Sequence, residues 1–501
     1  MSRFGLKSLA LVASLLVVSV ACRFSSPTPV AWSGTSTAKV LGLTQTAAAP
    51  SATATHPPLP TETPPVPETT PRTDAAIPAD GPWLIFPNEN NTMLYALDRD
   101  TRELATLNLP PLVELGDLAV GIAPDSSSLV LRAGNLDTLE NLGLYRVQNP
   151  VDPPELVSPL LADFVIKSIG ERNDPQASFA LQAVLQPNAL AWKPNSQSVV
   201  FPAAIEGVAA NLRAYQPASG KVTRLSVRYQ QNFSPLWNPS GQTLLFQEVD
   251  TLNNPSAWKP YLVTSLNLGN PGNLYYLYKP PANSQAEVFV GWINNAQAVS
   301  YTLTEEGNRF VRVLNAASGG SPRVIYSGFF DEIAVDPDDG VIALAVGVDA
   351  ARQNGVSPGI YLSNSALNAF GLVSVGTFSH LSYSQTEGSF FASGEIGLVS
   401  FSTNGLEFSL AGEAQASASP DGAWLVTWGG QGARLRTPDG TLLQEITSSS
   451  VSALVWQRDG KGFYLLLEDG LYHYTFPLLQ GVLVCEDVSR TDETWFAWLG
   501  K

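Results

Sequence analysis

Short apolar runs separated by polar turns recur along the chain from residue 82 to its end. In residues 190–201, "LAWKPNSQSVVF", an apolar run ends at Trp192, a Pro-Asn-Ser turn follows, and a second apolar run begins. Residues 235–246, "PLWNPSGQTLLF", repeat this order around Trp237. Because both apolar runs are short and are bounded by turn-forming residues, the pattern predicts a strand–turn–strand unit.

Each copy of the unit has an anchor residue, often Trp, at the end of its first strand. The anchors of the other copies are Ile122, Trp292, Val335, Tyr383, Ala418 and Trp456. Successive anchors lie 35 to 70 residues apart, and most spacings are close to the roughly 40–45 residues of a four-stranded propeller blade. Two further strands follow the unit, as in residues 211–227, "NLRAYQPASGKVTRLSV". We expect the anchor tryptophans to pack between neighbouring blades.

The two ends of this region complement each other. Residues 82–109 have the pattern of second, third and fourth strands without a first, and residues 493–501, "ETWFAWLGK", have that of a first strand with Trp498 as anchor. Together they predict one shared blade, which would close the ring and leave no open sheet edge. Eight complete units plus the closing blade can be counted at face value. We predict an all-β propeller of about eight blades, within a range of seven to nine.

No stretch of residues 82–501 shows sustained helical periodicity with capping residues, so no helices are expected there. Strands of a propeller blade alternate in direction, so second-to-third loops and blade-to-blade loops share one face. The insertions fall in these two classes of loop: residues 133–143, 162–188, 248–261 and 347–359. Loops carry function more often than the strands that support them. This face is the predicted contact surface, with the candidates Arg172, Asp174, Trp258, Tyr261 and Arg352; the alternative is that the loops are tolerated insertions.

The first eighty residues have a different composition from the rest. Residues 1–21 combine basic residues, a short apolar run and small residues before Cys22, which is typical of a secretory signal. The stretch "SVAC" resembles the lipobox of bacterial lipoproteins, with Ser19 where Leu or Val is usual, and the resemblance implies lipidation at Cys22. Residues 22–80 are rich in Thr, Pro, Ala and Ser and predict a disordered linker ahead of a propeller at 81–501. The alternative is a soluble secreted protein.

Composition and charge narrow the classes of partner. Charged residues make up 14% of the chain and the net charge is −16. The negative sign disfavours nucleic acid and anionic lipid headgroups. The chain has two cysteines and three histidines. Since Cys22 belongs to the signal, Cys485 is expected to be a small buried residue in a strand, and neither a metal site nor a cofactor is predicted.

The turn motifs resemble a known family. "APDSSSLVL" (123–131), "DPDDGVIAL" (336–344) and "SPDGAWLVT" (419–427) are similar to the Pro-Asp-Gly repeat of TolB-type, WD40-like propellers. Copies such as "NPSG", "WINNAQ" and "SQTEG" depart from that motif. The resemblance covers residues 82–501 and implies a propeller that acts as an interaction scaffold.

Motifs of known propeller enzymes are missing from the sequence. There is no G-x-S-x-G elbow and no Asp box of the sialidase type. The favoured function is a non-enzymatic, membrane-anchored, extracytoplasmic and monomeric propeller that binds an envelope protein or polysaccharide. One alternative is a glycan-active or lyase-type enzyme with carboxylates in the central channel. Another is a structural or sensory envelope protein.

Overall fold

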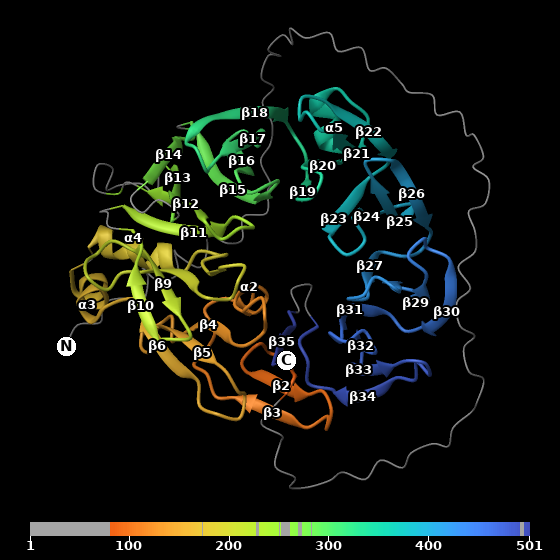
Figure 1. Cartoon of the computed structure of the whole chain (residues 1–501), viewed down its shortest axis with the longest axis horizontal. Helices are drawn as coiled ribbons and strands as arrows, with labels where there is room; N and C mark the ends of the chain where they lie inside the picture. The colour runs from red at the N-terminus through yellow and green to blue at the C-terminus, as the bar shows by residue number, and fades with distance from the viewer. Residues whose placement is uncertain are drawn as a thin grey trace, which may run out of the picture. The chain divides into compact units, whose positions relative to one another are not determined.

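Antiparallel four-stranded sheets arranged in a ring make up most of the described chain (Figure 1). The described part of the chain is 51% strand and 8% helical, which confirms the predicted all-β class. The predictions for residues 1–80, including Cys22, and for Trp258 concern residues outside the described part of the chain. The computed structural model describes residues 81–172, 174–226, 230–249, 251, 261–268, 273–281, 283–490 and 495–500.

Within these residues the sheets form nine blades, at the upper end of the predicted range. Blades 1 to 3, from the innermost strand outward, contain β35 (Ala497–Leu499), β1 (Trp83–Pro87), β2 (Leu94–Asp98) and β3 (Leu104–Leu107); β4 (Leu129–Ala133), β5 (Gly143–Val147) and β6 (Glu155–Pro159); β7 (Ala191–Trp192), β8 (Val199–Ala203), β9 (Asn211–Gln216) and β10 (Lys221–Arg224). In blade 2 the innermost position is reduced to an isolated bridge between Ile122 and Leu129.

Blades 4 to 6 follow the same order. They contain β11 (Gln231–Trp237), β12 (Thr243–Val249), β13 (Tyr261–Asn267) and β14 (Asn273–Tyr278); β15 (Ser284–Trp292), β16 (Gln297–Thr304), β17 (Arg309–Asn315) and β18 (Gly320–Gly328); β19 (Glu332–Asp336), β20 (Val341–Val346), β21 (Gly359–Ser363) and β22 (Phe370–Val375).

Blades 7 to 9 complete the ring. They contain β23 (Phe378–Ser384), β24 (Ser389–Gly394), β25 (Gly397–Ser402) and β26 (Gly405–Leu410); β27 (Gln415–Ala418), β28 (Leu425–Gly429), β29 (Gly432–Arg436) and β30 (Leu442–Thr447); β31 (Val451–Trp456), β32 (Gly462–Leu467), β33 (Gly470–Thr475) and β34 (Val482–Cys485). The ring closes as predicted: β1 pairs with β35, and Trp83 lies opposite Leu499. Cys485 is buried at the end of β34, also as predicted.

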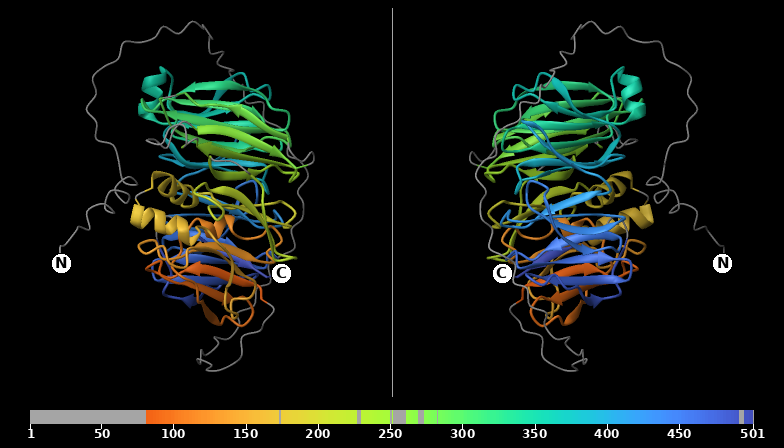
Figure 2. Two further views of the ribbon diagram at one scale, coloured as in Figure 1. Left: turned by 90° about the vertical axis from the view of Figure 1, so that its left-hand side faces the viewer. Right: turned by 90° about the vertical axis from the view of Figure 1, so that its right-hand side faces the viewer.

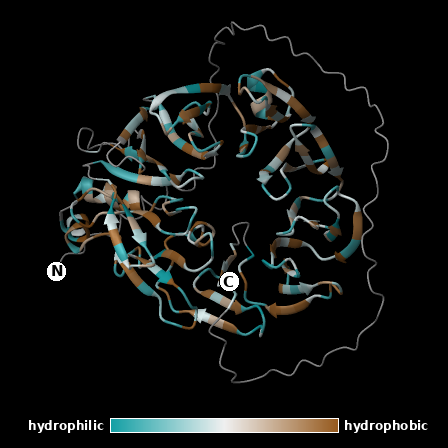
Figure 3. Cartoon of the chain, viewed as in Figure 1, coloured by the Kyte–Doolittle hydropathy of each residue, from teal (hydrophilic) through white to brown (hydrophobic). Residues whose placement is uncertain are grey.

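The core is divided into layers between the blades. The buried apolar residues of the described chain form nine clusters, one for each pair of neighbouring blades. In the layer between blades 3 and 4, for example, Val200 and Leu212 pack with Leu244 and Phe246. Figure 3 shows the same distribution, since hydrophobic residues follow the strands and many connecting loops are hydrophilic. Each blade is therefore stabilised mainly by its two neighbours.

The anchor tryptophans are buried between blades, as the repeat predicted. Their indole N–H groups donate to backbone carbonyls of the preceding blade: Trp192 to Gly121 (2.7 Å), Trp237 to Ala191 (3.2 Å), Trp456 to Ser417 (3.3 Å) and Trp498 to Trp456 (2.8 Å). Trp292 is equally buried, but its indole N–H has no hydrogen-bond partner. The anchor position thus joins apolar packing to a directional bond between blades.

The expectation of no helices is wrong in several connections. The structure has α2 (Asp117–Val120), α3 (Asp163–Arg172), α4 (Pro175–Val184) and α5 (Val348–Asn354). Helix α4 begins with an N-cap at Asp174, whose carboxylate accepts a hydrogen bond from the Gln176 backbone N–H (2.9 Å), and Pro175 occupies the first helical position. Its residues Ala177, Ala180 and Val184 are fully buried. The linker at 162–188 is therefore a helical hairpin packed on the layer between blades 2 and 3.

Candidate binding face

The connections between strands lie on two faces of the ring, and those of one face are longer than those of the other. First-to-second and third-to-fourth turns lie on one face, which we call the plain face. Second-to-third loops and blade-to-blade loops lie on the other, which we call the elaborated face. Helices α3, α4 and α5 all belong to connections of the second class, and Figure 2 shows them projecting from the same side of the blades. The prediction that the insertions share one face is confirmed for the described parts.

Two of these elaborations contact each other. The side-chain amide of Gln176 on α4 donates to the backbone oxygen of Thr251, in the loop after β12 (2.6 Å), and the Thr251 hydroxyl donates back to the same side chain. The other end of α4 is held by Arg132 of β4, whose Nη1 donates to the carbonyls of Val184 (2.6 Å) and Gln186 (2.9 Å). These bonds fix the hairpin relative to blades 2 and 4.

Arg132 is itself held by a buried ion pair. It is 0% exposed, and its Nε and Nη2 donate to the two carboxylate oxygens of Asp117 at 2.9 and 2.8 Å. The Arg132 backbone N–H also donates to Asp117 (3.1 Å). Because the guanidinium is planar, this bidentate geometry leaves Nη1 directed at the end of α4. The pair therefore links the fold of blade 2 to the position of the hairpin.

A hollow of about 450 Å³ lies on the elaborated face between blades 1 and 2. It is lined by residues 108–111 together with Asn135, Glu140 and Asn141. Residues 108–111 follow the outermost strand of blade 1, and the others belong to the loop 134–142 after β4. The two segments are joined by the Gly134 backbone N–H, which donates to the Pro111 carbonyl (2.8 Å).

Within the described connections, exposed large apolar side chains are more numerous on the elaborated face than on the plain face. Those of the described connections on the elaborated face are Met93, Leu136, Phe164, Val348, Val356, Ile396 and Trp495. The described connections of the plain face carry two, Val151 and Leu478. Single exposed apolar residues are ordinary, but their concentration on one face is typical of an interaction surface.

The predicted contact residues lie in different environments, and some of them are outside the described part of the structure. Asp174 caps α4 and is half-buried. Arg352 lies on α5 and is exposed, and it pairs with Asp349 (3.2 Å). Arg172 ends α3 and Tyr261 begins β13, but their side chains are outside the described part of the structure, as is Trp258. The prediction did not include the hollow, whose only sequence signal is Asn and Glu side chains within an insertion.

The inner strands of blades 6 and 7 bring together a second group of polar side chains. His380 sits in a bulge of β23 with φ of 55°, and its Nδ1 lies 3.0 Å from Ser393 Oγ. Glu332 of β19 accepts from the backbone N–H groups of His380 (3.1 Å) and Leu381 (2.6 Å). The carboxylate therefore holds the backbone of the bulge. Bulges re-aim side chains, and here the bulge exposes the imidazole.

Near the plain-face end of the same strands is a hollow of about 400 Å³. Its lining includes Trp292, Val335 and Tyr383. Burial and a hydrogen bond to Asp336 raise the pKa of Tyr383 far above its usual value, so the phenol stays protonated. The described residues contain no group of three or more His, Cys, Asp or Glu side chains placed to hold a metal ion.

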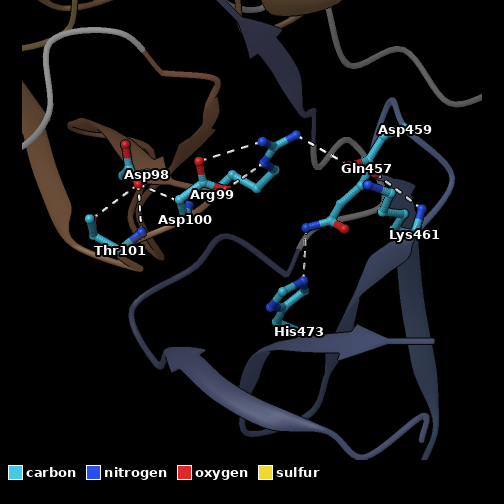
Figure 4. A network of polar contacts seen from close by, with 8 residues as sticks. All are labelled: Asp98, Arg99, Asp100, Thr101, Gln457, Asp459, Lys461 and His473. Atoms are coloured by element: carbon cyan, nitrogen blue, oxygen red, sulfur yellow. Dashed lines mark hydrogen bonds and ion pairs between the residues drawn. The ribbon is translucent and has the colours of Figure 1, made fainter. Parts of the chain in front are cut away.

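The plain face carries turn-forming networks. In the turn after β2, one carboxylate oxygen of Asp98 accepts from the backbone N–H groups of Asp100 (2.9 Å) and Thr101 (2.7 Å) (Figure 4). Arg99 reaches across the blade boundary to Asp459 (3.4 Å). These bonds confirm that turn aspartates bind back to the turn backbone.

His473 of β33 lies beneath this network. It is buried, stacks on Tyr464 with ring centroids 4.5 Å apart, and its Nε2 is 2.9 Å from Gln457 Nε2 (Figure 4). Loss of hydration lowers the pKa of His473 to about 4. The imidazole is therefore neutral at physiological pH, and the side chain is a packing element of blade 9.

The sequence matches none of the protein-family models and none of the curated proteins with which it was compared. Among solved structures, a eukaryotic initiation factor is 8% identical with a TM-score of 0.44 and covers 84% of this chain and 96% of its own. A putative TolB from Agrobacterium tumefaciens is 12% identical with a TM-score of 0.30 and covers 50% and 81%. An oligogalacturonate lyase in complex with manganese is 12% identical with a TM-score of 0.35 and covers 57% and 88%.

The sheets of the described residues form a β-propeller, and a TolB protein and a WD40 domain are among the solved structures similar to the chain. At these identities the activities of those proteins do not transfer to it. None of the described helices is both long enough and apolar enough to cross a bilayer.

Proposed function

We propose that the protein is a lipid-anchored, extracytoplasmic and non-enzymatic propeller of the TolB type that binds an envelope component through its elaborated face. The observation that carries this proposal is the sorting of connections: every described insertion, and seven of the nine exposed large apolar side chains in described connections, belong to that face. A propeller whose loops were merely tolerated insertions would have no reason to concentrate its exposed apolar connection residues on one face.

The attachment point of the N-terminal segment supports the same arrangement. Strand β1 begins at Trp83, which pairs with Leu499 at the end of the first strand, and this edge belongs to the plain face. The described chain therefore enters the propeller at the plain face, and residues 81–83 occupy none of the connections of the elaborated face.

The proposal is tested with two matched surface variants of the full chain expressed in its own envelope. The first replaces Phe164, Val348 and Ile396 by Ser on the elaborated face, and the second replaces Val151 and Leu478 by Ser on the plain face. All five side chains are exposed, so both variants should fold. Deleting the hairpin instead would remove the buried residues Ala177 and Ala180 from the core.

After chemical cross-linking and capture, the elaborated-face variant should lose the partners of the wild type by at least about tenfold, whereas the plain-face variant should keep them. Equal recovery of every partner by the two variants would refute the assignment of the face. A signal that stays attached, or a Cys22→Ser variant that remains membrane-bound, would refute the lipid anchor separately. Release of sugars from envelope glycans by the purified chain would favour the enzymatic alternative.

A further inference from the structure

We propose that the hollow between blades 1 and 2 is a docking site for a basic side chain, Arg or Lys, of a polypeptide partner that also presents apolar residues. This inference rests on the proposed function and deepens it, because it names the chemistry of the partner. The hollow has about 450 Å³, enough for one long side chain and part of its neighbours.

The loop that forms the hollow is fixed before any partner arrives. Leu139 is buried in the layer between blades 2 and 3 although its φ is 60°, so its packing holds a backbone conformation that Leu rarely adopts. The side-chain oxygen of Asn135 accepts from the backbone N–H groups of Asp137 (2.9 Å) and Thr138 (3.0 Å). The Tyr145 hydroxyl donates to the Asn141 carbonyl (2.9 Å). A preformed loop binds without an ordering cost.

The entry to the loop depends on one glycine. Gly134 has a φ of 153°, and a β-carbon there would lie 2.4 Å from Leu142 Cα. Only glycine permits this close approach of the two loop ends. The approach brings the exposed side chains of Asn135, Glu140 and Asn141 beside residues 108–111.

The lining matches a long basic side chain. One wall is Leu109, Pro110 and Pro111, an apolar surface on which the aliphatic part of Arg or Lys can lie. Glu140 supplies an anionic group for the charged end. Asn108 and Asn141 each carry a donor and an acceptor, and Asn135 keeps its amide N–H donors, which suits the peptide groups on either side. No residue that lines this hollow is aromatic, so the stacking surface that neutral sugars would use is missing from its wall.

The surroundings of the hollow carry mostly negative charge, which is opposite in sign to a basic side chain. The described connections of blades 1 to 3 on this face, including α3 and the cap of α4, contain nine acidic residues and two basic ones: Glu89, Glu114, Asp117, Asp137, Glu140, Asp163, Glu171, Asp174 and Glu206 against Lys167 and Arg172. Of these acids, Asp117 pairs with Arg132 of β4, and Glu206 pairs with Arg213 and Arg224 of blade 3. A cationic partner is therefore attracted and an anionic one repelled. The exposed Leu136 lies within the same loop, and Met93 and Phe164 are exposed in the neighbouring connections. These side chains favour a partner in which apolar residues flank the basic one.

The test uses the full chain and fluorescein-labelled peptides of the sequence Gly-Leu-Xaa-Leu-Gly, in which Xaa is Arg, Lys, citrulline or Glu. Citrulline has the shape of Arg without its charge. Fluorescence anisotropy should show the tightest binding for Arg or Lys, at least about tenfold weaker binding for citrulline, which corresponds to about 1.4 kcal/mol, and none for Glu. Raising the salt concentration should weaken the Arg and Lys peptides only.

Two isosteric variants locate the site. Glu140→Gln should weaken the Arg peptide at least about tenfold and leave the citrulline peptide unchanged, and Glu395→Gln, an exposed acid of the same face in another blade, should have no effect. Equal binding of Arg and citrulline peptides, unchanged binding by Glu140→Gln, or no binding of any peptide up to about 1 mM overturns the inference. Displacement of the labelled Arg peptide at a lower concentration of a chitosan oligomer than of the unlabelled Arg peptide would overturn the polypeptide assignment. The proposed function survives any of these results if the elaborated-face variant still loses its partners.

Discussion

The buried pair of Asp117 and Arg132 offers the sharpest test of how the elaborated face is built. The perturbation is Arg132→Met, which keeps a long unbranched side chain and removes the charge. It leaves the Asp117 carboxylate, which is 1% exposed, without its counter-ion, and it removes the donor for the carbonyls of Val184 and Gln186 at the end of α4. Removing one partner of a buried ion pair costs about 3–5 kcal/mol.

The two carbonyls add to that cost, since an unpaired buried acceptor costs about 1–3 kcal/mol. These contributions overlap, so we expect the free energy of unfolding to fall by about 4 kcal/mol, a large share of the roughly 5–15 kcal/mol of an ordinary domain. Urea unfolding of the full chain, followed by tryptophan fluorescence, measures the change. Limited proteolysis should in addition cut the hairpin 163–184 first, because α4 has lost its C-terminal contact.

Two controls separate the buried pair from charge in general. Arg352→Met removes an ion pair whose side chains are 75% and 84% exposed, and it should leave the unfolding midpoint unchanged. The double variant Asp117→Leu with Arg132→Met replaces both charges by apolar groups and should recover most of the loss. The reasoning is refuted if Arg132→Met stays within about 1 kcal/mol of the wild type, or if the double variant is as unstable as the single one.

Three further predictions concern the ring itself. The pKa of His473 is about 4 in the folded state and about 6.5 in the unfolded state. The free energy of unfolding should therefore fall by about 1.4 kcal/mol for each unit by which the pH is lowered from 6.5 to 4. Urea titrations at several pH values should show that His473→Phe removes this part of the pH dependence. Trp498→Phe should cost about 1 kcal/mol more than Trp292→Phe in the same assay, because only the first loses a hydrogen bond; equal losses would contradict this. Asp98→Ala should lower the melting temperature by several degrees, and Asp98→Asn, which keeps an acceptor oxygen, should lower it less.

Much of the propeller can be predicted from short stretches of sequence, because a few neighbouring residues specify each turn and each innermost strand. The turn at residues 336–340 has an aspartate whose carboxylate accepts from the backbone N–H groups of Asp338 (2.8 Å) and Asp339 (3.1 Å), and Pro and Gly set its backbone angles. An anchor Trp after an apolar run identifies the innermost strand in the same way. One or the other of these signals recurs in most blades, so their number gave the blade count to within one.

The helical hairpin was missed although its signals are present. Asp174 followed by Pro175 is a helix start, and Ala177, Ala180, Leu181 and Val184 follow at helical spacing. The strand repeat on both sides made a loop the expected element there. The hollow is a different case, since residues 108–111 and the loop 134–142 meet only through the Gly134–Pro111 bond of the folded chain. The sequence spacing between Asn108 and Glu140 does not predict that the two segments meet.

The repeat itself indicates which residues bear on stability and which on recognition. Positions that recur in many blades, such as the anchor Trp237 and the turn residue Asp336, satisfy a need that every blade shares, so substitutions there should change stability. Positions that depart from the repeat, such as Glu140 and Phe164, are exposed. The other blades fold without an equivalent residue. Stability therefore does not account for their presence, and their substitution should change binding while leaving the unfolding curve in place.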